Sequence, residues 1–148
     1  LGNTMKTYSI LLIIFCTLLS GCNNSPKPVS NGADSCHLCK MTIVDKQHAA
    51  QFMTKKGRSY AFDAAECMLN HLNEIDRNTV ALFLINDYNS PGEFIDATTA
   101  SYLISQNIPS PMGEYLTAFN DQGAAEKAQA ANEGEVFSWE EIQNKFKK

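Results

Sequence analysis

The sequence lacks an excess of positive charge, because 12 lysine and arginine residues stand against 16 aspartate and glutamate residues, giving a formal net charge of −4. Binding to nucleic acid requires a basic surface, so this acidic balance gives no indication of a nucleic-acid-binding protein. The chain is also short, at 148 residues, which limits it to one or two small domains. Its 44% of hydrophobic residues is enough to bury a core.

Cysteine is scarce and unevenly placed, with five residues in all. There is one C-x-x-C pair, Cys36 and Cys39, and neither a second such pair nor an H-x₃-H pair. A structural zinc site draws its four ligands from two spaced pairs, so this absence counts against structural zinc. Cys16 and Cys22 belong to an N-terminal segment described next, which leaves three thiols. An odd number does not suggest a complete disulfide framework.

The most apolar run, YSILLIIFCTLLS, is short of a membrane span. It follows Lys6 and ends in LSGC, Leu19 to Cys22. A positive residue, a short apolar region and small residues in this order are typical of a secretory signal. The small residues before Cys22 resemble a bacterial lipobox, so we predict a lipoprotein signal peptide at 1–21 and lipidation of Cys22. A lipoprotein cysteine normally carries several acyl chains, as stable anchoring requires.

The segment 22–35 is rich in proline, serine and asparagine, which predicts an extended, flexible tether. The chain that follows shows two related patterns. VDKQHAAQFM aligns with IDATTASYLI, and YAFDAAE aligns with TAFNDQGAAE. We therefore predict an α+β fold made of two related β-β-α-β units, 36–90 and 91–148, that arose by internal duplication.

The first unit is expected to contain a short strand at 41–45, a hairpin over 49–62, a helix, and an apolar strand at 79–87. Asp63 stands where the N-cap of the helix would be. Glu66 follows three residues later, the spacing of a capping box.

The second unit is expected to repeat this order and to close with a helix capped by Ser138. Its segment Asn107–Tyr115, NIPSPMGEY, has no counterpart in the first unit and is expected to form a loop between two strands. Two prolines restrict the backbone of this loop, which can therefore hold the side chain of Met112 in a defined place.

The stretch CHLCKM, Cys36 to Met41, places two thiols, an imidazole and a thioether together and leaves several chemistries open. A thiol–disulfide oxidoreductase places C-x-x-C at a helix N-terminus, whereas this pair precedes a predicted strand. A structural disulfide between Cys36 and Cys39 is a second alternative. A zinc site completed by Cys67 and one of the histidines is a third.

A soft-metal site is the fourth alternative. In an extended chain, residues i and i+2 point to the same side, so the thiol of Cys39 and the thioether of Met41 would converge. Soft sulfur ligands select Cu(I) over harder divalent ions. Met112 lies outside the apolar patterns and is therefore also a candidate ligand. His37, between the two thiols, is a candidate third ligand. The residues expected to have structural or surface roles are Cys67, His48 and His71.

The motifs C-x-x-C-x-M, F-D-x-x-E-C and P-S-P-M-G, taken in this order, resemble those of the NosL family. These are periplasmic lipoproteins that accompany nitrous oxide reductase and are regarded as copper chaperones. The match runs from LSGC to EVFSWEEI. The resemblance implies a Cu(I) site with Cys39, Met41 and Met112, completed by Cys36 or His37. It also implies two β-β-α-β units related to the organomercurial lyase core.

The sequence departs from the family at Lys40, where glycine is expected. From the resemblance we expect a protein that is not an enzyme and is tethered by Cys22 to the periplasmic side of a membrane. It would hand Cu(I) to apo nitrous oxide reductase or to its assembly transporter. Asn23 and Asn24, in place of aspartate after the lipidated cysteine, favour the outer membrane. The alternative function is a membrane-tethered thiol–disulfide oxidoreductase that uses the C-x-x-C pair.

Overall fold

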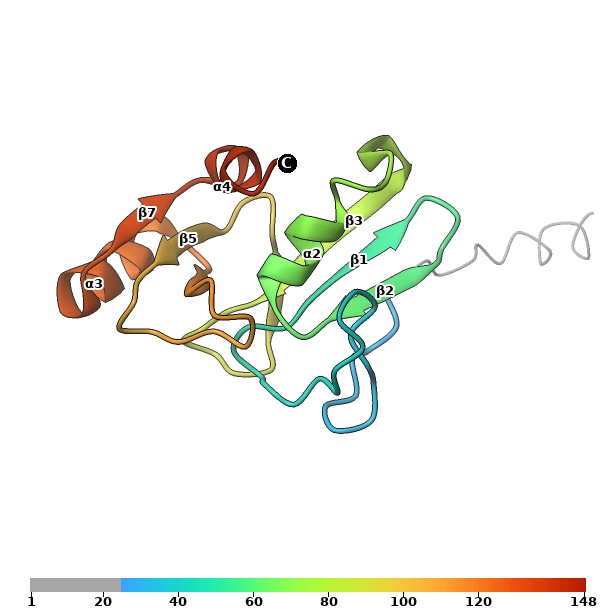
Figure 1. Cartoon of the computed structure of the whole chain (residues 1–148), viewed down its shortest axis with the longest axis horizontal. Helices are drawn as coiled ribbons and strands as arrows, with labels where there is room; N and C mark the ends of the chain where they lie inside the picture. Colours follow the sequence, from blue (N-terminus) through green and yellow to red (C-terminus); the bar gives the residue numbers. More distant parts are fainter. Residues whose placement is uncertain (1–24) are drawn as a thin grey trace, which may run out of the picture.

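The computed structural model describes residues 25–148, so the predicted signal peptide and Cys22 lie outside the described residues. Two antiparallel sheets form the framework (Figure 1), one with the strand order β2-β1-β3-β4 and the other with the order β6-β5-β7. Helices pack against these sheets, which confirms the predicted α+β class.

The first sheet contains β1 (Ala50–Thr54), β2 (Ser59–Phe62), β3 (Val80–Asn86) and β4 (Phe94–Asp96), with helix α2 (Ala65–His71) and the 3-10 turn η1 (Arg77–Thr79) between β2 and β3. The predicted hairpin is β1–β2. Gly57 has a φ of 81° in its turn, a left-handed conformation that glycine adopts without steric cost. Strand β4, from the segment assigned to the second unit, pairs with β3 and extends the first sheet.

The second sheet contains β5 (Ser101–Ile104), β6 (Leu116–Phe119) and β7 (Glu135–Phe137), with helix α3 (Gln122–Asn132) before β7 and helix α4 (Trp139–Lys145) after it. Its elements follow in the order β-β-α-β, and its strands are arranged as β2-β1-β3 are in the first sheet. The predicted β-β-α-β order is thus confirmed for both units. Ser138 caps α4 through a capping box with Glu141, also as predicted.

One hydrophobic core joins the two units. Phe52 and Met68 from the first unit belong to the same buried cluster as Tyr102, Leu116 and Ile142 from the second. All five are 1% exposed or less. Burial of apolar surface is the main favourable contribution to folding, so this shared core couples the two units. The end of β2 and the start of α2 lie at this junction, because α2 contacts β6 as well as β1 and β2.

Two local predictions were wrong. The segment 41–45 is not a strand, because its one ladder contact is an isolated bridge between Thr42 and Ser35. The N-cap of α2 is Ala64, and no side chain caps the helix. Asp63 lies one residue too early, and its carboxylate accepts a hydrogen bond from the thiol of Cys39 instead.

The described part of the predicted tether lies against the first unit. The amide of Lys27 donates to Ser59 Oγ at 3.2 Å, and the amide of Gly32 donates to the carbonyl of Ile43 at 2.7 Å. Ser59 is the first residue of β2, so the chain enters the fold beside the turn of the β1–β2 hairpin. Within residues 25–148, none of the helices combines the length and the apolar character needed to cross a bilayer.

Candidate metal centre

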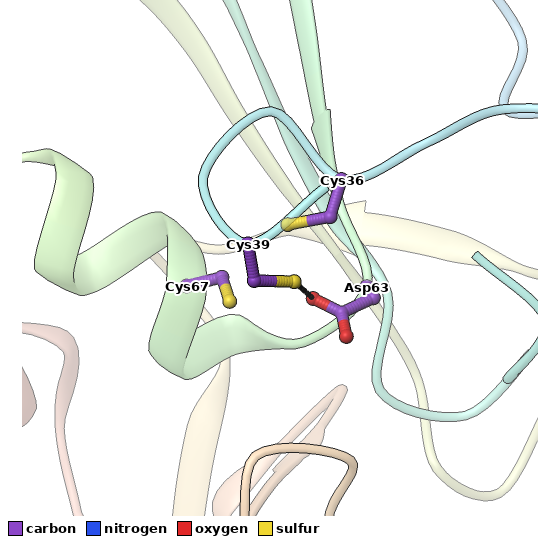
Figure 2. A group of neighbouring side chains, drawn as sticks. All are labelled: Cys36, Cys39, Asp63 and Cys67. Carbon is purple, nitrogen blue, oxygen red and sulfur yellow. Dashed lines mark hydrogen bonds between the residues drawn. The ribbon is translucent and has the colours of Figure 1, made fainter. Parts of the chain in front are cut away.

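Three thiols and one carboxylate meet at the end of β2. One ligand atom from each of Cys36, Cys39, Asp63 and Cys67 lies within 4.8 Å of the others. Figure 2 shows Cys36 and Cys39 on one loop, Asp63 where the chain leaves β2, and Cys67 on α2. We call these four side chains the thiol cluster. Cys36, Asp63 and Cys67 are buried and Cys39 is partly exposed, so the cluster has one accessible side.

The loop that carries Cys36 and Cys39 is held by backbone hydrogen bonds. The amide of Cys36 donates to the carbonyl of Met41 at 2.8 Å, which closes the loop. The amide of His37 donates to the carbonyl of Ala61 at 2.8 Å, which fixes the loop to β2. The N-terminal segment therefore lies on the same strand that ends just before Asp63, and this contact brings the C-x-x-C pair to α2.

Asp63 and Cys67 come from the motif FDAAEC. Asp63 follows the last residue of β2, and Cys67 is in the first turn of α2. The thiol of Cys39 donates to Asp63 Oδ1 at 3.4 Å (Figure 2). The other carboxylate oxygen, Oδ2, is buried and has no hydrogen-bond partner among the described residues. A buried carboxylate oxygen without a partner is costly, and a bound cation would satisfy it.

The thiols of the cluster differ in acidity. A hydrogen bond from Cys67 lowers the pKa of Cys36 to about 6. The same hydrogen bond, assisted by burial, raises the pKa of Cys67. Burial also raises the pKa of Cys39. At neutral pH the cluster therefore contains one thiolate, at Cys36, and two thiols that must lose a proton before they bind a metal.

The two candidate methionine ligands are exposed. Met41 is 47% exposed and Met112 is 40% exposed, whereas Met53 and Met68 are buried. Met41 follows the C-x-x-C loop directly, but Lys40 has a φ of 67°, so the chain between Cys39 and Met41 is not extended. The argument from alternating side chains therefore does not hold. That φ also gives a physical reason for glycine at this position, since the left-handed region penalises other residues.

The loop with Met112 is attached to α2 next to Cys67. The hydroxyl of Ser110 donates to Glu66 Oε1 and accepts the amide of Tyr115 at 2.9 Å. The amide of Leu116 also donates to Glu66 Oε1, at 3.4 Å. Glu66 is 0% exposed and neighbours Cys67 in the chain. The motif with F-D-x-x-E-C and the motif with P-S-P-M-G thus meet through one buried carboxylate.

We expect Glu66→Gln to become more stable than the wild type as the pH rises above the ordinary pKa of a glutamate. Burial raises the pKa of Glu66 in the folded state. At pH values between the pKa of Glu66 in the unfolded chain and its higher pKa in the folded chain, the folded chain keeps a proton that the unfolded chain has lost. The wild type therefore loses stability as the pH rises through this range. Glutamine keeps an oxygen for Ser110 and carries no charge.

Urea unfolding of both proteins across a pH series measures this difference. Glu93→Gln, at an exposed position, is the matched control and should leave the pH dependence unchanged. If the free energies of unfolding of the wild type and Glu66→Gln differ by the same amount at every pH, the pKa of Glu66 does not change on folding.

The histidines lie outside the thiol cluster. The ring of His37 packs against those of Tyr60 and His71, with centroid distances of 4.6 and 5.0 Å. Burial and the neighbouring His71 lower the pKa of His37. His48 is buried, and its Nδ1 lies 3.1 Å from Asp45 Oδ2. Among residues 25–148, the one group of at least three metal-binding side chains is therefore the thiol cluster, which contains no histidine.

The structure thus brings Cys36 and Cys39 together, as expected, and adds two residues that were not proposed as copper ligands. Cys67 was assigned to the core because it is followed by Met68 and Leu69, and it is indeed 1% exposed. Asp63 was assigned to a helix cap. Both residues belong to the motif F-D-x-x-E-C, and this motif is the signal that could have indicated both.

Comparisons with known proteins identify a family and a fold for this chain. The model of the NosL family matches residues 28–146. The copper-binding lipoprotein NosL of Stutzerimonas stutzeri is 28% identical over an alignment of 149 positions, which covers 90% of this chain and 78% of that protein. The crystal structure of the copper chaperone NosL from Shewanella denitrificans has the same fold, with a TM-score of 0.71 at 20% identity, over 82% of this chain and 97% of that chain.

Proposed function

The chain belongs to the NosL family, and from this premise we propose that it is a membrane-tethered carrier that binds Cu(I) at the thiol cluster and transfers it to a partner protein. The observation that supports this proposal best is the convergence of Cys36, Cys39 and Cys67 within 4.8 Å. Thiolates are soft ligands that favour Cu(I), and a cluster with one open side allows the ion to enter and leave.

The proposed ligand set has an inner and an outer part. The inner part consists of the three thiolates, and Asp63 contacts the ion through its unpartnered oxygen. The outer part consists of Met41 and Met112, whose exposed thioethers capture the ion and pass it on. His37 joins this set only if its ring leaves Tyr60 and His71, because both now contact it.

The partner follows from the family resemblance. We propose that Cu(I) is delivered to apo nitrous oxide reductase or to its assembly transporter, and that Cys22 carries the lipid anchor on the periplasmic side. The test is a transfer assay in which the copper-loaded protein is mixed with the apo enzyme under anaerobic conditions. Transfer should be faster than from a small Cu(I) complex of equal affinity, because a docked partner exchanges ligands directly. Equal rates from both donors would contradict the delivery function.

A thiol–disulfide oxidoreductase is the second candidate. The lowered pKa of Cys36, about 6, favours it, because a thiolate is the attacking species in disulfide exchange. The burial of Cys36, at 1% exposure, opposes it, because a substrate disulfide has to reach the sulfur. Turnover of a disulfide substrate by the metal-free protein would favour the oxidoreductase, provided that the variant Met112→Ala retains the same turnover.

We expect Cu(I) binding to become stronger with rising pH and to release protons. Near pH 7 Cys36 is already a thiolate, because its pKa is about 6, whereas Cys39 and Cys67 still carry protons. Binding to all three sulfurs should therefore release about two protons per copper ion near neutral pH and about three below pH 6. Titration in weak buffer with a pH indicator counts them. In Cys36→Ser the number at pH 5 should fall by one, and an unchanged number would exclude Cys36 as a ligand.

A further inference from the structure

The lipid anchor and the folded unit are separated by a short length of chain. Lys27 is hydrogen-bonded through its amide to Ser59, the first residue of β2. Only five peptide units join Cys22 to Lys27, and at about 3.5 Å per residue they reach at most about 18 Å. Ser59 directly follows the turn of the β1–β2 hairpin, so this turn lies beside the point at which the chain from Cys22 joins the described fold.

That turn is basic in a protein of net negative charge. Lys55, Lys56 and Arg58 lie within four consecutive residues and are exposed. Among residues 25–148, none of the three forms an ion pair. The guanidinium of Arg58 lies over the ring of Tyr60, 5.1 Å from its centroid, which leaves its charge uncompensated. Lys27 lines the same cavity as Arg58, of about 220 Å³, but is paired with Asp34 at 3.3 Å.

Among residues 25–148, the acidic groups near this turn form no ion pairs with it. The carboxylate of Asp34 accepts from Lys27 Nζ and from the amide of Ser30. Asp76 accepts the amide of Asn78, and Glu74 lies 3.3 Å from His71 Nδ1, so neither forms an ion pair with the turn. Three positive charges without an ion-pair partner among the described residues therefore lie where the N-terminal segment joins the fold. An anionic bilayer surface attracts such charges and enriches the orientation in which they face it.

We propose that the turn Lys55–Arg58 lies on the anionic headgroups of the bilayer that holds the lipid of Cys22, and that this contact points the thiol cluster away from the membrane. The turn precedes β2 and Asp63 follows it, so the cluster is about 13 Å further along the strand, at about 3.3 Å per residue. The proposal rests on the proposed anchor and deepens it, because it explains how a tethered carrier keeps its metal site accessible to a soluble partner.

The C-terminal lysines provide an internal comparison. Lys145, Lys147 and Lys148 form a second basic group on and after α4. No short connection to the anchor holds that end near the bilayer. The orientation is therefore tested by comparing the two groups of lysines in one molecule.

The test uses the full lipidated protein in vesicles of phosphatidylcholine, alone or with phosphatidylglycerol as a minority lipid. A water-soluble acylating reagent modifies exposed lysines, and mass spectrometry reports the rate at each one. Each basic residue near an anionic surface contributes about a fivefold preference. We expect Lys55 and Lys56 to react at least about fivefold more slowly on the anionic vesicles, with Lys147 and Lys148 unchanged. At 1 M salt, where the screening length is about 3 Å, the protection should disappear.

Two charge reversals complete the test. Arg58→Glu should reduce the protection of Lys55 and Lys56 and leave Cu(I) binding unchanged, and Lys148→Glu should do neither. Mass spectrometry of the protein before reconstitution shows whether Cys22 carries lipid. A protein without this lipid would contradict the anchor and the orientation together. A lipidated, vesicle-bound protein whose Lys55 and Lys56 react equally on both kinds of vesicle would contradict the orientation alone.

Discussion

Cys67→Ala should lower the affinity for Cu(I) by at least about 100-fold. Loss of a residue that supports a metal ligand typically lowers metal affinity 10–100-fold, and loss of the ligand itself should cost at least the upper end of that range. Cys67 lies within 4.8 Å of both cysteines of the C-x-x-C pair, and its hydrogen bond keeps Cys36 in the thiolate form. The substitution therefore removes one ligand and weakens another. The folding cost should be about 1 kcal/mol, since a small buried side chain is shortened by one atom.

A purely structural role for Cys67 predicts the opposite pattern, in which stability falls and copper affinity holds. Met68→Leu is the matched control, because it removes a neighbouring buried sulfur at nearly constant volume. Met68 is 0% exposed and lies outside the thiol cluster. This control should cost less than about 1.5 kcal/mol and leave Cu(I) binding as it was. Urea unfolding and competition with a Cu(I) chelator, measured on both variants, separate the two roles.

Met112→Ala should lower the affinity for Cu(I) about tenfold, the lower end of the range for loss of a supporting metal contact. It should change the free energy of unfolding by less than about 0.5 kcal/mol, since Met112 is 40% exposed and an exposed side chain contributes little to stability. A methionine that filled the core would instead cost about 2–5 kcal/mol on truncation. The exposure of Met112 removes that alternative, so the affinity decides the question.

The control for Met112 is Tyr115→Ala in the same loop. Tyr115 is 37% exposed and offers no soft ligand atom, so its loss should leave the affinity for Cu(I) unchanged. If both variants weaken binding equally, the loop contributes through its conformation and not through the thioether. If neither does, Met112 is not a ligand, and the contact between the second unit and the thiol cluster serves only the fold.

The repeated units could be predicted because their signals are local. Asp45 and Asp96, which align in the two patterns, form equivalent turns. The carboxylate of Asp45 accepts the amide of Gln47 at 2.6 Å, and that of Asp96 accepts the amide of Thr98 at 2.8 Å. Each turn directs the chain into the first strand of its unit. Side chains that bond to the backbone two residues on leave a mark in the sequence itself.

The wrong strand at 41–45 has a physical explanation. Within the segment Ile43 is buried, at 0% exposed, while Met41 and Val44 are 47% and 68% exposed, so the apolar pattern of the sequence is not matched by alternating burial. The backbone there bonds to the N-terminal segment, for example through the amide of Ile43 to the carbonyl of Asp34 at 2.9 Å. Alternating hydrophobicity indicates a buried face, but it does not show that a neighbouring strand exists.

The thiol cluster could be predicted only in part, because its two halves meet through tertiary contacts. Cys36 and Cys39 are adjacent by their spacing in the sequence. Asp63 and Cys67 join them because the C-x-x-C loop bonds to Ala61 on β2, a contact that no local pattern specifies. The caps assigned to Asp63 and Glu66 followed residue preference, but both carboxylates bond to groups distant in the sequence. Tertiary partners overrode local capping at the residues that build the site.

The most direct test of the thiol cluster is X-ray absorption spectroscopy at the copper edge. The reduced protein and the variant Cys67→Ala are each loaded with one equivalent of Cu(I) under anaerobic conditions and measured in the same way. The structure predicts one tightly bound ion per chain in a first shell of sulfur, and a loss of one sulfur scatterer in the variant. A first shell of nitrogen and oxygen, or a spectrum that the loss of Cys67 leaves unchanged, would contradict a copper site built on these thiols.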